Sequence, residues 1–127
     1  MRFLLVDDLD TMIRITKNVL SDLGYNDVIT ARNGEQAYQI LNKGKIDFII
    51  SDWNMPVMNG IELLKKVKST PKLADIPFLM MTAESEKEHI IEAIQAKVDQ
   101  YLIKPFNQEM LGQKIGQALH KMGKNEG

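Results

Sequence analysis

The chain has 127 residues, of which 44% are hydrophobic and 26% are charged, and its formal net charge is −1. These values predict one soluble globular domain and argue against nucleic acid or an anionic membrane as a partner. The chain contains no cysteine, which excludes disulfides and thiolate metal sites and is compatible with a cytoplasmic location. The apolar run at the N-terminus is too short for a signal peptide or for a membrane-spanning helix.

The first predicted element is a strand at residues 2–6, a continuous apolar run of the kind that is buried on both faces of a sheet. A helix follows, capped by Asp10 or Thr11 and closed by Gly24. Its predicted apolar stripe consists of Met12, Ile15, Val19, Leu20 and Leu23.

A second, weaker strand at residues 27–31 is best placed at the edge of the sheet. The next helix ends at Gly44, and its stripe consists of Ala37, Ile40 and Leu41. The third strand, residues 46–51, leads directly into Asp52. Gly60 opens a helix that ends in the region of Pro71 and Pro77, and its stripe consists of Ile61, Leu64 and Val67.

A fourth strand at residues 78–82 and a fifth at 100–103 complete the predicted sheet. The helix between them uses Ile90, Ile91 and Ile94 as its apolar face, and the stripe of the last helix consists of Met110, Leu111, Ile115, Ala118 and Leu119. Five strand–helix units in succession predict a doubly wound, three-layer α/β fold with a parallel sheet between two layers of helices.

Four of the five predicted strands end in a reactive polar residue. Taken singly, such residues simply mark where a strand leaves the core. As a set they predict a site, because the carboxyl ends of parallel strands lie on the same rim of the sheet. The residues are Asp7, Asp8, Asp52, Thr82 and Lys104.

Three clustered carboxylates either raise one another's pKa or require a cation, and oxygen ligands without His or Cys favour Mg²⁺ over zinc or copper. A hydroxyl at Thr82 and an ammonium at Lys104 suit a phosphoryl group. Since a carboxylate can itself be the nucleophile, these residues predict Mg²⁺-dependent phosphoryl transfer to an aspartate.

Four motifs carry a resemblance to a known family: VDD (6–8), SDWNMPVMNG (51–60), MTA (81–83) and YLIKPF (101–106). Over residues 2–120 the chain resembles the receiver domain of two-component response regulators, and within that family the single-domain chemotaxis regulators. The resemblance implies a flavodoxin-like, five-stranded parallel sheet of order 2-1-3-4-5. It also implies a receiver domain at 1–122, a frayed tail at 123–127 and no output domain.

The resemblance assigns roles to individual residues. It makes Asp52 the phosphoacceptor and Lys104 the phosphoryl-binding cation, with a cis bond to Pro105. Mg²⁺, or Mn²⁺ as a substitute, would be held by Asp7, Asp8, Asp52 and the backbone carbonyl of Asn54. The implied switch residues are Thr82, Ala83 and Tyr101, and the residues that tune dephosphorylation are Asn54 and Glu84.

The resemblance also implies partners. A histidine kinase would be the phosphodonor, and a phosphatase is a further expected partner. The protein is expected to be a monomer and not to insert into membranes. The output would be a changed surface on the fourth helix, fifth strand and fifth helix, which binds the flagellar motor switch in chemotaxis. The chain is expected to be a signalling switch rather than an enzyme, catalysing only its own phosphorylation and dephosphorylation.

Two positions depart from the family pattern. Asp10 replaces a small hydroxyl residue and is expected to be a helix N-cap, with added negative potential beside the metal as the alternative. Lys97 replaces a glycine, so the left-handed residue that closes the helix is expected to be absent or strained. Trp53 is expected to be a packing residue, and His89 and His120 to be solvated surface residues.

Three alternative functions remain open. A single-domain phosphorelay shuttle would pass its phosphoryl group to a histidine phosphotransfer protein. A haloacid-dehalogenase-like phosphohydrolase shares the Asp, Thr and Lys, but Met12 occupies the last position of its D-x-D-x-[T/V] signature. A flavodoxin would require a Ser/Thr-Gly loop after the first strand, and here that loop is acidic.

Overall fold

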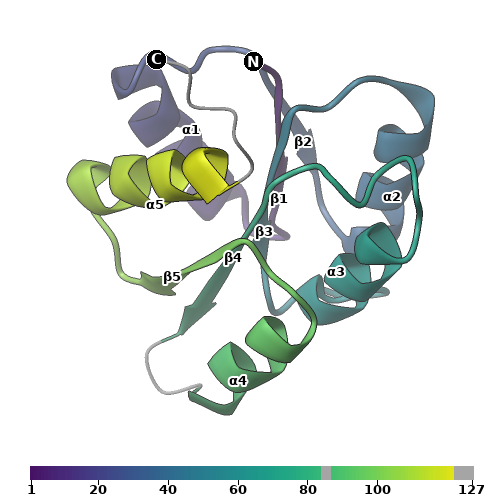
Figure 1. Cartoon of the computed structure of the whole chain (residues 1–127). Coiled ribbons are helices and arrows are strands. Elements are labelled where there is room, and N and C mark those ends of the chain that lie inside the picture. Colours follow the sequence, from purple (N-terminus) through teal and green to yellow (C-terminus); the bar gives the residue numbers. More distant parts are fainter. Residues whose placement is uncertain (84–86, 122–127) are drawn as a thin grey trace.

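The computed structural model describes residues 1–83 and 87–121, and it contains a five-stranded parallel sheet of order β2-β1-β3-β4-β5 (Figure 1). The predicted fold class and strand order are therefore confirmed. Glu84 and the predicted tail at 123–127 lie outside the described residues. The strands are β1 (Phe3–Val6), β2 (Val28–Ala31), β3 (Phe48–Asp52), β4 (Phe78–Ala83) and β5 (Gln100–Lys104).

Helices cover both faces of the sheet (Figure 1). On one face lie α1 (Asp10–Asp22) and α5 (Gln108–Lys121), and on the other lie α2 (Gly34–Lys43), α3 (Gly60–Lys68) and α4 (Lys87–Gln95). Successive side chains of β1 point to opposite faces, so Leu4 packs in the cluster under α2 and α3, while Leu5 packs in the cluster under α1 and α5. Across residues 1–83 and 87–121, no helix has the length and apolar character needed to span a membrane.

Strands β1 and β3 are completely buried, and β2 is only half buried, as expected for an edge strand. The β1–β3 and β3–β4 pairings place the last residues of β1, β3 and β4 at one end of the sheet. The sheet thus brings the strand ends together on one rim, and this rim is where the polar residues lie.

The rotation of three helices differs from the predicted apolar stripes. In α1 the buried residues are Ile13, Thr16 and Leu20, whereas Ile15 is 45% exposed. In α4 both Ile91 and Ile94 are more than half exposed, and Met110 of α5 is also exposed. Apolar spacing marks a broad stripe on a helix, and packing against the sheet then decides which edge of that stripe is covered.

The starts of α1 and α3 are held in different ways. The predicted N-cap role of Asp10 is wrong: Leu9 occupies that position without a side-chain cap, and Asp10 is the first helical residue and pairs with Arg32. In α3, Asn59 and Glu62 form a capping box in which each side chain accepts a hydrogen bond from the other residue's backbone N–H. Gly24 closes α1 with a φ of 95°, as predicted.

Lys97, which follows α4, has a φ of 68°. The left-handed closing conformation is therefore present and is occupied by a residue with a Cβ, which is a strained arrangement. Val57, in the loop after β3, shares this φ of 68°. A β-branched residue rarely adopts this conformation, so the loop beside Asp52 also stores backbone strain.

Lys97→Gly is expected to stabilise the protein by about 0.5–1 kcal/mol, because glycine removes the left-handed penalty but loses more chain entropy on folding. Urea denaturation measures this change. The matched control is Lys17→Gly, at an exposed position inside α1, which is expected to destabilise by about 1 kcal/mol. Equal losses at both positions would contradict the strain assigned to Lys97.

Candidate functional site

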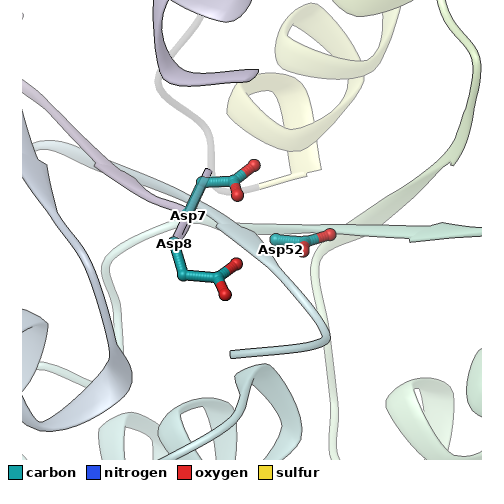
Figure 2. A group of neighbouring side chains, drawn as sticks. All are labelled: Asp7, Asp8 and Asp52. Atoms are coloured by element: carbon teal, nitrogen blue, oxygen red, sulfur yellow. The ribbon is translucent and has the colours of Figure 1, made fainter. Parts of the chain in front are cut away.

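Three carboxylates meet at the carboxyl ends of β1 and β3 (Figure 2). Asp7 and Asp8 follow the last residue of β1, and Asp52 is the last residue of β3. Each offers one carboxylate oxygen, and these three atoms lie within 4.8 Å of one another. Asp7 and Asp52 are buried, whereas Asp8 is the more exposed of the three. Such a group can hold a hard cation that is still open to solvent on one side.

Lys104, at the end of β5, supplies a positive charge to this cluster. Its Nζ donates a hydrogen bond to Oδ1 of Asp52 over 2.7 Å. The bond between Lys104 and Pro105 is cis. Among the residues that the structure describes, the ion pair of Lys104 within this cluster is with Asp52.

The carboxyl of Asp7 has a raised pKa because it is buried next to another acid. Burial raises the pKa of its carboxyl above the ordinary value of 3.8, and the negative charge of Asp52 acts in the same direction. The hydrogen bond from the Leu9 backbone N–H to Oδ1, over 3.0 Å, opposes this rise in pKa. Oδ2 of Asp7 is buried and has no hydrogen-bond partner among residues 1–83 and 87–121.

Thr82 lies one residue beyond the partner of Asp52 on the adjacent strand, because Asp52 pairs with Met81. Its hydroxyl is buried and, within the part of the chain that the structure describes, has no hydrogen-bond partner. A buried hydroxyl without a partner is costly, so this group is available to a ligand. Ala83 follows it and pairs with Lys104.

Tyr101 lies on β5 and pairs with Met80 of β4. Its ring is half buried, and Nζ of Lys114 on α5 lies 5.0 Å from the ring centroid. In the resting state the Tyr101 ring therefore lies next to α5. Along β5, Tyr101 is two residues before Ile103, which pairs with Thr82.

The loop after β3 is tied to the neighbouring elements on both sides. The backbone N–H of Trp53 donates to the Met81 carbonyl over 3.1 Å, and the Trp53 carbonyl accepts from Gly60 over 2.8 Å. A Cβ at Gly60 would lie 2.4 Å from the Asp52 carbonyl oxygen, so only glycine fits there. Asn54 is exposed and lines a hollow next to Asp8.

The structure thus brings the predicted strand-end residues to one rim, where Lys104 contacts Asp52 and the three acids each place a carboxylate oxygen within 4.8 Å of the others. The expectation that His89 is a solvated surface residue is wrong, because its ring stacks on that of Trp53. Trp53 is a buried packing residue, and His120 is exposed, as expected. No spacing signal in the sequence joins Trp53 to His89, since they lie on different elements.

A family model described as the response regulator receiver domain matches residues 3–116. Among curated proteins, the chain is 46% identical to the chemotaxis protein CheY-3 of Vibrio cholerae serotype O1 over 122 residues, which cover 96% of this chain and 94% of that protein.

Two solved structures show the same likeness in three dimensions. The chemotaxis response regulator CheY4 of Vibrio cholerae superposes on this chain with a TM-score of 0.84 at 36% sequence identity. The alignment covers 93% of this chain and 98% of the CheY4 chain. The receiver domain of the sensor histidine kinase PA1611 from Pseudomonas aeruginosa, described with a magnesium ion coordinated in its active-site cleft, has a TM-score of 0.82 at 26% identity, with 96% and 97% coverage. The chain therefore belongs to the response regulator receiver family and is a CheY-like receiver domain of two-component signalling.

Proposed function

We propose that this protein is a Mg²⁺-dependent phosphoacceptor switch in which Asp52 accepts a phosphoryl group from a histidine kinase. The observation that carries the proposal is the 2.7 Å contact between Lys104 Nζ and Asp52 Oδ1, beside the carboxylates of Asp7 and Asp8. One buried carboxylate is thereby paired with a cation suited to phosphoryl oxygens, and it stands next to an acidic group suited to a metal.

The donor set fits Mg²⁺, with Mn²⁺ as a substitute. All side-chain donors are carboxylate oxygens, and the buried Oδ2 of Asp7 has no partner within the described residues. The magnesium ion in the PA1611 receiver domain, a relative with the same fold, supports this assignment. The ion would be held by the side chains of Asp7, Asp8 and Asp52 and by the backbone carbonyl of Asn54.

In the proposed reaction, a carboxylate oxygen of Asp52 attacks the phosphorus of a phosphohistidine. The P–N bond breaks as the P–O bond forms, and the departing imidazole takes up a proton. The ammonium group of Lys104 neutralises charge on the phosphoryl oxygens, and a Mg²⁺ ion held by the acidic group would supply further neutralisation. Water later attacks the phosphorus, which releases inorganic phosphate and restores the carboxylate, at a rate tuned by Asn54 and Glu84.

The switch follows from the hydroxyl of Thr82. A phosphoryl group on Asp52 would offer this buried hydroxyl the acceptor that it lacks within the described part of the chain. Thr82 moves toward the phosphoryl group to make this hydrogen bond, and the small side chain of Ala83 leaves room for that movement. Tyr101 then turns inward from its half-buried position. A single new hydrogen bond at the rim would thereby be converted into a changed surface on α4, β5 and α5.

Asp52→Asn is expected to reduce phosphorylation by acetyl phosphate and Mg²⁺ by at least about 100-fold, because an amide is a poor nucleophile. Intact-mass spectrometry measures the labelled fraction. Asp99→Asn is the matched control: Asp99 is also buried and paired with a lysine, since Lys68 Nζ lies 3.0 Å from it. Asp99 precedes β5, at the other end of that strand from Lys104, so its variant should keep the label. Label on Asp8, or steady turnover of a phosphate ester, would instead favour the phosphohydrolase.

The partners proposed are a histidine kinase as donor, a flagellar motor switch protein as effector, and a phosphatase. The identity to chemotaxis protein CheY-3 supports the motor switch over the phosphorelay shuttle. The receiver domain is proposed to span residues 1–122 and to act as a monomer.

Activation with beryllofluoride is expected to increase capture of a purified motor switch protein by at least about tenfold, since a switch must bind its effector differently in its two states. A pull-down with and without beryllofluoride, quantified on gels, measures the change. The Asp52→Asn variant is the control and should show no increase. Capture of a histidine phosphotransfer protein alone would favour the shuttle.

A further inference from the structure

The indole of Trp53 and the imidazole of His89 form a parallel stack. Their ring centroids lie 3.9 Å apart, with an interplanar angle of 3°. Trp53 follows Asp52 directly in the chain, and His89 lies in the first turns of α4. The stack therefore joins the loop of the acceptor residue to α4, which is part of the proposed output surface.

The Trp53 side of this stack is held by backbone hydrogen bonds and by burial. Its backbone N–H and carbonyl are bonded to Met81 and Gly60 respectively. The side chain is only 4% exposed and belongs to the apolar cluster under α2 and α3. Its position, directly after Asp52, is thus set by contacts with β4 and with the start of α3.

The α4 side is held much less firmly. Ala93 is the one buried residue between Lys87 and Gln95, all of which the structure describes, whereas Ile91 and Ile94 are 59% and 57% exposed. The ion pair between Glu92 and Lys65 is solvent-exposed, with an N···O distance of 3.6 Å, and such pairs contribute little. Because so little of α4 is buried, a stacked ring pair is a substantial part of what fixes the position of this helix.

We propose that His89 is a positioning residue whose stack on Trp53 holds α4 in its resting position, so that occupation of the phosphoryl site must break the stack to move the helix. This inference rests on the proposed function and adds a second link, beside Thr82 and Tyr101, between Asp52 and the surface that carries Ile91 and Ile94. The stack stabilises the resting state alone. By linkage, its loss favours the activated state and any ligand that binds that state.

The test is the affinity of the full chain for beryllofluoride in the presence of Mg²⁺, measured by isothermal titration calorimetry at one pH. His89→Ala is expected to tighten binding by about three- to tenfold, the range that corresponds to one stacked aromatic pair. His89→Phe, which restores a stacked ring, should bind within about twofold of the unmodified protein. Gln95→Ala, at an exposed position of the same helix, should also match it.

The single tryptophan gives an independent readout of the stack itself, because the chain has only Trp53. The fluorescence emission of Trp53 should change when beryllofluoride is added to the unmodified protein. In His89→Ala, the emission before beryllofluoride is added should already differ from that of the unmodified protein. A structural role without coupling would lower the stability of His89→Ala and leave its beryllofluoride affinity unchanged.

The inference is overturned if His89→Ala binds beryllofluoride as the unmodified protein does, or more weakly. It is also overturned if Gln95→Ala tightens binding as much as His89→Ala does, since loosening of the helix would then suffice. Failure of the proposed function has a different signature: beryllofluoride would not bind the unmodified protein, or it would bind Asp52→Asn equally well.

Discussion

Gly60→Ala is expected to destabilise the protein by about 2–4 kcal/mol, because the added Cβ has no space. It would lie 2.4 Å from the Asp52 carbonyl oxygen, 2.9 Å from the Trp53 Cα and 2.8 Å from the Met80 Sδ. Two of these atoms are backbone and cannot rotate away. The start of α3 must therefore move, which would also break the hydrogen bond from the Gly60 N–H to the Trp53 carbonyl.

Urea denaturation measures this loss of stability, and the labelled fraction after acetyl phosphate treatment measures the displacement of Asp52. The matched control is Gly116→Ala in α5, where an added Cβ meets nothing within 4 Å. That substitution should stabilise the protein by up to about 1 kcal/mol, through helix propensity alone. If the free energy of unfolding of Gly60→Ala were within about 0.5 kcal/mol of that of the unmodified protein, the loop after β3 would not be tightly packed against α3.

Asp7→Asn is expected to stabilise the metal-free protein by about 1–2 kcal/mol and to weaken Mg²⁺ binding by at least about tenfold. The substitution removes one of three clustered negative charges and leaves an amide of the same shape. The same charge that destabilises the metal-free fold is needed to bind the cation, so stability and affinity move in opposite directions.

The pH dependence follows from the raised pKa of Asp7. Because the folded-state pKa lies above the ordinary value of 3.8, the fold favours the neutral carboxyl. This contribution to stability is fully present below about pH 3.8 and is lost as the pH rises through the folded-state pKa. The gain in stability from Asp7→Asn in the metal-free protein should therefore be absent in acid and grow towards neutral pH.

Thermal denaturation with EDTA and with saturating Mg²⁺, across this pH range, checks both effects. Added Mg²⁺ should raise the melting temperature of the unmodified protein more than that of Asp7→Asn, since a ligand stabilises in proportion to its occupancy of the native state. Asp75→Asn is the control, because Asp75 is exposed and outside the acidic group; it should change stability by less than about 0.5 kcal/mol. Equal effects of Mg²⁺ on both variants would remove Asp7 from the proposed metal site.

Much of the site was predictable because it depends on chain order and strand period. Continuous apolar runs identify buried strands, and parallel connection then brings the residues after those runs to one rim. Asp7, Asp52 and Lys104 could be grouped in this way although they belong to three different strands. The half-buried state of β2 likewise follows from its weaker apolar pattern.

The rotation of the helices was less predictable. Ile15, Ile91 and Ile94 fit an apolar stripe by spacing, yet all three are exposed, while Thr16 is buried. Helical period alone allows neighbouring rotations of the stripe, and the shapes of the side chains on the sheet select one of them.

The sequence by itself determined the class of fold, the rim on which the polar residues meet, and the chemistry that an all-oxygen acidic group with a lysine and a threonine can support. Only the tertiary structure decided that Asp10 pairs with Arg32 rather than capping α1, and that His89 stacks on Trp53. The physical reason is the range of the interactions. Period and strand polarity are local properties of the chain, whereas ion pairs and ring stacks between elements depend on how distant segments pack.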